Sequence, residues 1–200
     1  MEKEFWLRTD EGEDVAASLR HAVRSFTFVI ADDQAWKWVA LSLHSALQGA
    51  CVCHLVTTAN PVGAVTRKNA AEWLVYFDAT ITDPKAASPK THLMTLPDLL
   101  KAIRQPYSAG DRSNSSGIRL SEKELKWLRR FHDDVRNQFT HFEPMGWSIE
   151  VSGFPGLAKL IARLVGEIAS VGWAFRHKDA DWMQELRNSS KALSTIQLNA

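Results

Sequence analysis

Residues 132–144, HDDVRNQFTHFEP, place an arginine, an asparagine and a histidine near the end of a predicted helix. Histidine titrates near neutral pH and can act as a general base or a general acid. Arginine keeps its charge and can hold a phosphate group with two hydrogen bonds. Asn137 can orient either the histidine or the phosphate. Arg136, Asn137 and His141 are therefore the candidate catalytic residues.

The helix geometry leaves two ways of building a site from these residues. On an ideal helix Arg136 and His141 lie about 140° apart and flank the core-facing stripe without touching. Asn137 and His141, one turn apart, share a face. A site within one chain needs the helix to unwind near its end, which Pro144 favours. A site shared between two subunits is the alternative. The ordinary interpretation also stays open, in which Arg136 pairs with Asp133 and His141 bonds the last helix carbonyls.

The stretch Arg136-Asn137-Gln138-Phe139-Thr140-His141 resembles the R-N-x-x-x-H signature of the HEPN superfamily (higher eukaryotes and prokaryotes nucleotide-binding). The resemblance implies an all-α bundle, a homodimer whose Arg and His meet at the dimer interface, and a metal-independent endoribonuclease. In RNA cleavage a base takes the 2′-OH proton, an acid protonates the leaving 5′-oxygen, and positive charge stabilises the phosphate. His141 would supply the base or the acid, and Arg136 the charge.

Two functions from different classes follow from this resemblance. The first is a homodimeric endoribonuclease of the toxin or defence type, with an antitoxin or another protein as a possible partner. The second is a non-catalytic HEPN-like module that binds RNA, a nucleotide or a protein partner in the same cleft. Some HEPN toxins carry a tyrosine, a target of adenylylation, two residues after the histidine. Glu143 stands at that place here, so silencing by that route is not expected.

Four further residues are candidates for lining the cleft. His44 and Gln48 lie one turn apart on a predicted buried helix, either beside Arg136 or as a satisfied pair in the core. Arg129 belongs to a basic patch with Lys126, Arg130 and Arg136. His132 forms a His-Asp dipeptide with Asp133, as in metal-dependent HD phosphohydrolases, but no other metal ligand has suitable spacing. Neither a metal site nor a cofactor is therefore expected.

Composition sets the broad class. The 200 residues are 45% hydrophobic and 24% charged, with a net charge of +1, so no global field draws the chain to nucleic acid or to a membrane. Cys51 and Cys53 are predicted to be buried free thiols of a reducing compartment. The N-terminus lacks the apolar run of a signal peptide, and the apolar stretch 39–56 is interrupted and short for a membrane span. A cytoplasmic location is expected.

Apolar periodicity predicts an all-α fold, an antiparallel bundle of four to five helices with a long central insertion. Residues 1–200 form one domain, and the loop-rich insertion covers about 59–118. Within it, the glycine- and serine-rich stretch 105–117 is expected to be mobile. Residues 144–153 are expected to be extended, with a short edge strand as an option. The helices are predicted at residues 14–30, 33–57, 68–80, 95–104, 122–143, 154–176 and 180–193.

The helix that carries Arg136 has the clearest signals. Ser121 and Glu124 form a capping box, and an apolar stripe follows at spacings of three and four. The stripe consists of Leu128, Phe131, Val135, Phe139 and Phe142. Residues 33–57 are apolar almost all round, which predicts a central helix, with Asp32 or Asp33 as its N-cap. Small residues at positions 42, 46, 49 and 53 would let a neighbouring helix approach closely.

Overall fold

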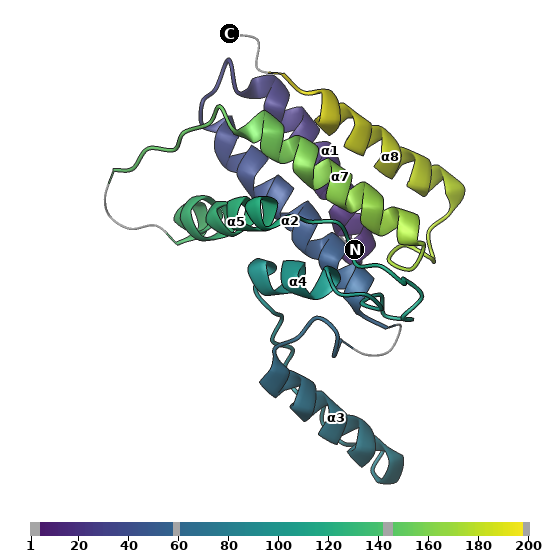
Figure 1. Ribbon diagram of the computed structural model, residues 1–200. Helices are drawn as coiled ribbons and strands as arrows, with labels where there is room; N and C mark the ends of the chain where they lie inside the picture. Colours follow the sequence, from purple (N-terminus) through teal and green to yellow (C-terminus); the bar gives the residue numbers. More distant parts are fainter. Residues whose placement is uncertain (1–4, 58–60, 142–145, 198–200) are drawn as a thin grey trace.

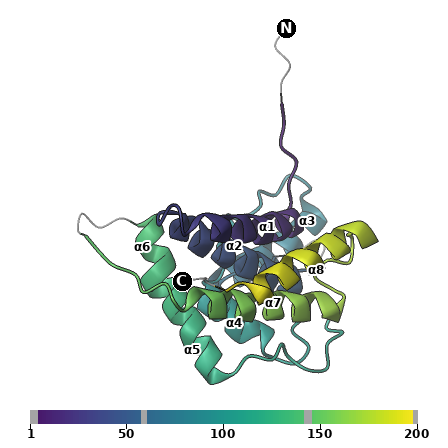
Figure 2. The same ribbon diagram turned by 90° about the horizontal axis from the view of Figure 1, so that it is seen from above.

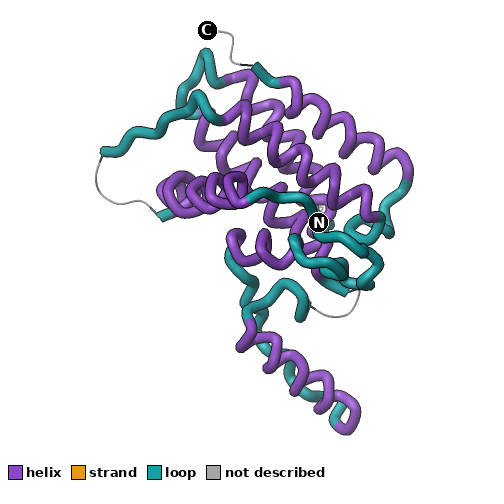
Figure 3. Tube along the Cα trace, viewed as in Figure 1, coloured by secondary structure: helices purple, strands orange, loops and turns teal. Residues whose placement is uncertain are grey.

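A computed structural model describes residues 5–57, 61–141 and 146–197 of the chain. The fold is an all-α helical bundle, as predicted. Within the described ranges the chain forms helices and loops and no strand, and an isolated antiparallel bridge joins Val65 to Leu93 (Figure 3). Residues 146–153 are irregular, so the optional edge strand is not formed.

The bundle is built on two helix pairs. The helices in chain order are α1 (Glu11–Phe28), α2 (Ala35–Leu55), α3 (Arg67–Thr82), α4 (Leu96–Ile103), α5 (Glu122–Arg130), the π-helix η1 (Phe131–Arg136), α6 (Asn137–Thr140), α7 (Phe154–Val171) and α8 (Ala180–Thr195). Figure 1 shows α1 and α2 packed beside α7 and α8, with α4 beside α2 and α5 next to α4. The segment before α1 leads away from the bundle (Figure 2).

The central helix is α2, as predicted. It packs against α1, α4, η1 and α7, and most of its residues are buried. Cys51 and Cys53 are free and buried, as predicted, whereas their reducing compartment stays a prediction. A Cβ atom on Gly49 would lie 2.8 Å from Cγ2 of Val15 in α1, so the small residue does allow the two helices to approach closely.

Two glycine-to-alanine substitutions distinguish the effect of this close contact on stability from the effect of helix propensity. Alanine in place of a mid-helix glycine adds about 1 kcal/mol of helix propensity, and Gly166→Ala in α7 should gain it because nothing lies within 4 Å of its Cβ position. Gly49→Ala should lose about 1–3 kcal/mol relative to Gly166→Ala, because the buried Val15 side chain must move. Urea unfolding of both variants measures the difference, and equal stabilities would contradict a tight α1–α2 contact.

Several helix boundaries differ from the prediction. Helix α1 begins earlier, at Glu11, because the carboxylate of Asp10 caps it by accepting a hydrogen bond from the Glu13 amide at 2.8 Å. Helix α2 begins after Gln34, and neither Asp32 nor Asp33 is its N-cap; Asp32 instead accepts a bond from the Gln34 amide. Helix α7 ends at Val171, because Gly172 adopts a left-handed conformation. Helix α8 extends to Thr195.

The predicted helix over residues 122–143 is interrupted. Its capping box is present, with Ser121 accepting from the Glu124 amide and Glu124 accepting from the Ser121 amide. The α-helix stops at Arg130, and residues 131–136 form η1 before the short α6. Leu128 and Phe131 are buried and Val135 and Phe139 are half-buried, as the apolar stripe requires. The predicted helix end at Glu143 and Pro144, and Phe142 of the stripe, lie outside the described residues.

The predicted insertion contains two different structures. Helix α3 projects from the bundle (Figure 1), whereas α4 contributes four fully buried side chains to the core: Leu96, Leu99, Leu100 and Ile103. The stretch 105–117, expected to be mobile, is folded around Asn114. Its side chain accepts a bond from the Ala109 amide and donates to the Ser116 carbonyl. Among the described residues, no helix is both long enough and apolar enough to cross a membrane.

Candidate functional site

The π-helix η1 positions the candidate site. Its wider turn adds a residue to the helix while Phe131 stays buried, packed against Phe154 of α7. His132 consequently faces α2, and Arg136 lies at the edge of a cleft beside His44. Single π-turns inside α-helices are frequent at functional sites, because they redirect side chains without ending the helix.

His44 and His132 form a partly buried imidazole pair. Nε2 of His44 lies 2.8 Å from Nδ1 of His132, and the two rings stack with centroids 5.0 Å apart and an interplanar angle of 21°. Because the contact joins two ring nitrogens, one ring donates its N–H and the other accepts. Which ring donates depends on the tautomer of each histidine. His44 is 4% exposed and His132 is half-buried, and of the two it is His44 that lines the cleft beside Arg136.

Both imidazoles are held neutral. Burial, together with the neighbouring His132 and the charge of Arg136, lowers the pKa of His44 to about 3. Burial also lowers the pKa of His132; Asp133 opposes this shift and Arg136 adds to it. A neutral imidazole can accept a proton, whereas an imidazolium beside a guanidinium would be repelled. At neutral pH both imidazoles are therefore available to accept a proton, although burial and the charge of Arg136 make them weaker bases than a free imidazole.

Arg136 is oriented by its neighbour in sequence. Its Nη1 donates a hydrogen bond to Oδ1 of Asn137 at 3.0 Å. Thr140, one turn further on, donates to the backbone carbonyl of Arg136 at 3.2 Å. Asn137 is thus engaged with Arg136 rather than with the side chain of His141. The remaining guanidinium donors of Arg136 can hold two oxygens of a phosphate.

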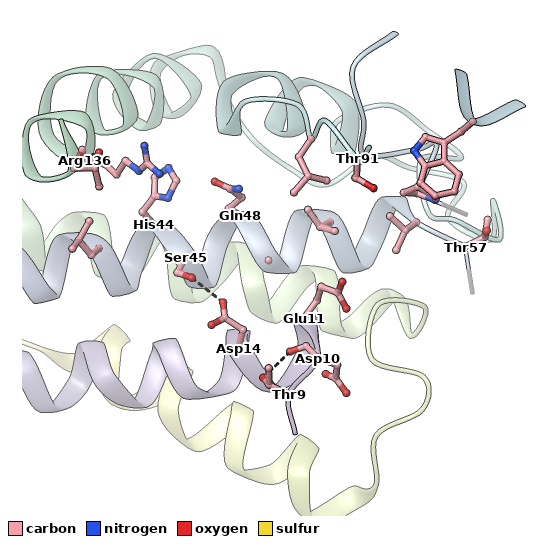
Figure 4. Close-up of a pocket in the computed structure, with 18 residues that line it drawn as sticks. Thr9, Asp10, Glu11, Asp14, His44, Ser45, Gln48, Thr57, Thr91 and Arg136 are labelled. Carbon is pink, nitrogen blue, oxygen red and sulfur yellow. Dashed lines mark hydrogen bonds between the residues drawn. The ribbon is translucent and has the colours of Figure 1, made fainter. Parts of the chain in front are cut away.

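The cleft beside Arg136 has a volume of about 910 Å³ and opposite charges at its two sides. Figure 4 shows Arg136, His44 and Gln48 along one wall, with Asp10, Glu11 and Asp14 at the start of α1 across from them. Ser45 donates a hydrogen bond to Asp14 at 2.8 Å between the two walls. The cleft is large enough for a nucleotide. Its lining favours an anionic group at Arg136 and a neutral or cationic group near the acidic wall.

Four candidates from the sequence are not among the residues that line this cleft: Asn137, His132, His141 and Arg129. His141 is exposed at the end of α6, where its amide bonds the Asn137 carbonyl, and no hydrogen bond or ion pair joins it to Arg136 in the described chain. Arg129 is exposed and faces Asp98, whose pKa its charge helps to lower. By contrast, His132 pairs with His44, and both His44 and Gln48 line the cleft with Arg136.

The contact between His54 and Ser108 has a structural role. His54 is fully buried and its Nε2 lies 3.0 Å from Oγ of Ser108. The Ser108 hydroxyl already donates to the Ile103 carbonyl, so His54 must donate to Ser108. A histidine that donates to a serine cannot take its proton, so Ser108 is not activated as a nucleophile. The contact instead ties the loop after α4 to α2.

Among the described residues, no three His, Cys, Asp or Glu side chains are grouped so that they could hold a metal ion. Comparison with protein-family models, with curated proteins and with solved structures finds no match for this chain. The assignment of the site therefore depends on the geometry of Arg136, His44 and His132.

The sequence did not reveal the pairing of His44 with His132. The two residues are 88 positions apart, and nothing in their local spacing links them. The π-turn that brings them together has no recognised sequence signal, because the capping box and apolar stripe before it are those of an ordinary helix. The sequence offered only a weaker indication of the site, which is that two histidines and Arg136 lie on apolar helices predicted to pack in one bundle.

Proposed function

We propose that the protein is a HEPN-like, metal-independent endoribonuclease that acts as a homodimer. The observation that carries the proposal is the placement of Arg136. Its guanidinium, oriented by Asn137, lies at the edge of a nucleotide-sized cleft beside a neutral imidazole pair. This combines a fixed phosphate-binding cation with a base, the two groups that RNA cleavage needs first.

In the proposed reaction Arg136 binds the scissile phosphate. A neutral imidazole takes the 2′-OH proton, and the 2′-oxygen then bonds to phosphorus while the bond from phosphorus to the 5′-oxygen breaks. A protonated imidazole donates the proton that the 5′-oxygen acquires. We assign the base to the hydrogen-bonded pair of His44 and His132, because both imidazoles are neutral and His44 lines the cleft beside Arg136. His141 is exposed at the end of α6, where it is accessible to a second copy, so we assign the acid to His141 of the partner subunit.

The test is cleavage of a mixed RNA pool by the purified protein in EDTA, beside the His141→Ala variant. We expect the wild type to cleave RNA and His141→Ala to be at least about 100-fold slower. His177→Ala, which removes another exposed histidine, is the matched control and should cleave like the wild type. Absence of cleavage by the wild type would contradict the ribonuclease proposal. Equal cleavage by wild type and His141→Ala would remove His141 from the mechanism.

The acidic wall favours a second candidate, a non-catalytic module that binds a nucleotide or a protein partner. Asp10, Glu11 and Asp14 would repel a phosphodiester chain that ran along the cleft away from Arg136. A nucleoside monophosphate places only one anionic group at Arg136 and a neutral base towards these carboxylates. Binding of such a nucleotide that Arg136→Ala weakens, in a protein that leaves RNA intact, would support this second function.

A further inference from the structure

Helix α3 is an arm with one covered face and one uncovered face. Of its residues, only Asn69 is buried. The Asn69 side chain fastens the arm to the returning chain, donating to the Lys90 carbonyl and accepting from the His92 amide, both at 2.8 Å. Trp73, Tyr76 and Phe77 pack together on this covered face, with ring centroids 5.6 Å apart. The arm is therefore held in place from one side.

The opposite face of α3 has the spacing of a helix-pairing seam. Its residues recur at intervals of four and three, and all are exposed: Arg67, Ala71, Leu74, Asp78 and Ile81. Leu74 is 54% exposed, Ile81 is 81% exposed, and the flanking Val75 is 69% exposed. Alternating steps of four and three align side chains along one contact line between two helices. An isolated helix of this length is marginal in water, so a contact along this seam would further stabilise α3.

The charges of α3 are reversed relative to its own dipole. Arg67 and Lys68 occupy the first turn, Asp78 and Asp83 lie towards the end, and no acidic residue in the first turn or basic residue in the last turn compensates. Cations near a helix N-terminus and anions near its C-terminus are unfavourable. An antiparallel neighbour with the same sequence corrects both ends, because it sets each basic end beside an acidic end.

We propose that two copies of the chain associate through an antiparallel pair of α3 helices. In this pair Arg67 forms an ion pair with Asp78 of the partner subunit, and two-fold symmetry makes the pair twice. The same register sets Ala71 against the partner's Leu74, so a large side chain packs over a small one. Neither Arg67 nor Asp78 has an ion-pair partner in the described part of its own chain.

The size of the contact sets the expected affinity. The overlap from Arg67 to Asp78 covers about three helical turns, and interfaces below about 1,200 Å² in total are weak and transient. The dimer should therefore be weak and transient, so its dissociation should be visible when the protein is diluted. This pairing does not depend on the proposed ribonuclease activity, because association is measured without RNA and α3 carries none of the proposed catalytic groups.

The experiment is sedimentation equilibrium of the full chain over a range of concentrations, with two charge reversals. Arg67→Glu sets two carboxylates together, and Asp78→Arg sets two guanidiniums together, so each should raise the dissociation constant at least about tenfold. An equimolar mixture of the two variants should associate again, because both ion pairs are then complementary in the heterodimer. Lys68→Glu, the same charge change on the same helix outside the seam, should leave association unchanged.

All substituted side chains are exposed, so helix content measured by circular dichroism should be the same in every variant. A wild type that stays monomeric at all concentrations would overturn the proposal. A dissociation constant that both single reversals leave unchanged would also overturn it, because the two copies would then associate elsewhere, as at the proposed shared site of Arg136 and His141. Recovery of association in the mixture of Arg67→Glu and Asp78→Arg is the result that only this pairing predicts.

Discussion

Replacing Arg136 by alanine should reduce kcat/KM for RNA cleavage by about 100- to 1,000-fold, the usual loss when one fixed group that stabilises transition-state charge is removed. Arg136 donates to Asn137 through Nη1, which leaves the rest of its guanidinium for the phosphate. Arg136→Lys should recover only part of the activity, because an ammonium group cannot make the same paired hydrogen bonds. Initial rates on a defined RNA, measured with all three proteins, give these ratios.

Arg187→Ala is the matched control for Arg136→Ala, because it removes an exposed arginine from α8, far along the chain from the cleft. We expect it to cleave at the wild-type rate. If Arg136→Ala and Arg187→Ala both retain wild-type kcat/KM, the cleft beside His44 is not the site of the reaction. If Arg136→Lys matches the wild type, a point charge suffices and the bidentate phosphate contact is contradicted.

The second large effect is a loss of stability in mild acid. The pKa values of His44 and His54 are lowered from 6.5 to about 3 and about 4, chiefly by burial. The unfolded chain therefore binds more protons than the folded chain below the ordinary histidine pKa. The stability that the two neutral histidines maintain is fully present above the ordinary histidine pKa of 6.5, and it is lost as the pH falls below that value. Between about pH 6.5 and about pH 5 each histidine should lower the free energy of unfolding by up to about 2 kcal/mol.

Urea unfolding at a series of pH values measures this loss. The double variant His44→Gln/His54→Gln should show a flatter dependence on pH, because neither glutamine titrates. His177→Gln, a change at an exposed histidine, should keep the wild-type slope. The window above about pH 5 avoids the carboxylates, whose ordinary pKa values lie near 4. A wild type whose stability is constant across this window would contradict the burial of His44 and His54 as neutral groups.

The parts of the fold that the sequence predicted are those with local causes. Ser121 and Glu124 define a helix start by themselves, and the almost uniformly apolar α2 has no stable place except the centre of the bundle. Leu128 and Phe131 follow the helical period and are buried as expected. The start of α1 was missed by three residues, because the Asp10 cap lies in a stretch whose other residues are mostly charged.

The parts that could not be predicted depend on contacts between distant residues. The π-turn at residues 131–136 keeps Phe131 in the core while His132 meets His44. No local sequence pattern predicts that these two histidines are in contact. The stretch 105–117 has a composition typical of mobile loops, yet Asn114 supplies the hydrogen bonds that shape it. For the site, Arg136, His44 and Gln48 do share one cleft, whereas the approach of His141 to Arg136 stays a prediction that requires a second subunit.

Subunit complementation tests the central claim most directly. Arg136→Ala and His141→Ala are each expected to be inactive, and each retains the residue that the other lacks. In a heterodimer one of the two shared sites regains both residues, so an equimolar mixture should recover about a quarter of the wild-type activity. Activity in the mixture that stays at the level of the separate variants, with a wild type that cleaves RNA, would contradict a site shared between two subunits.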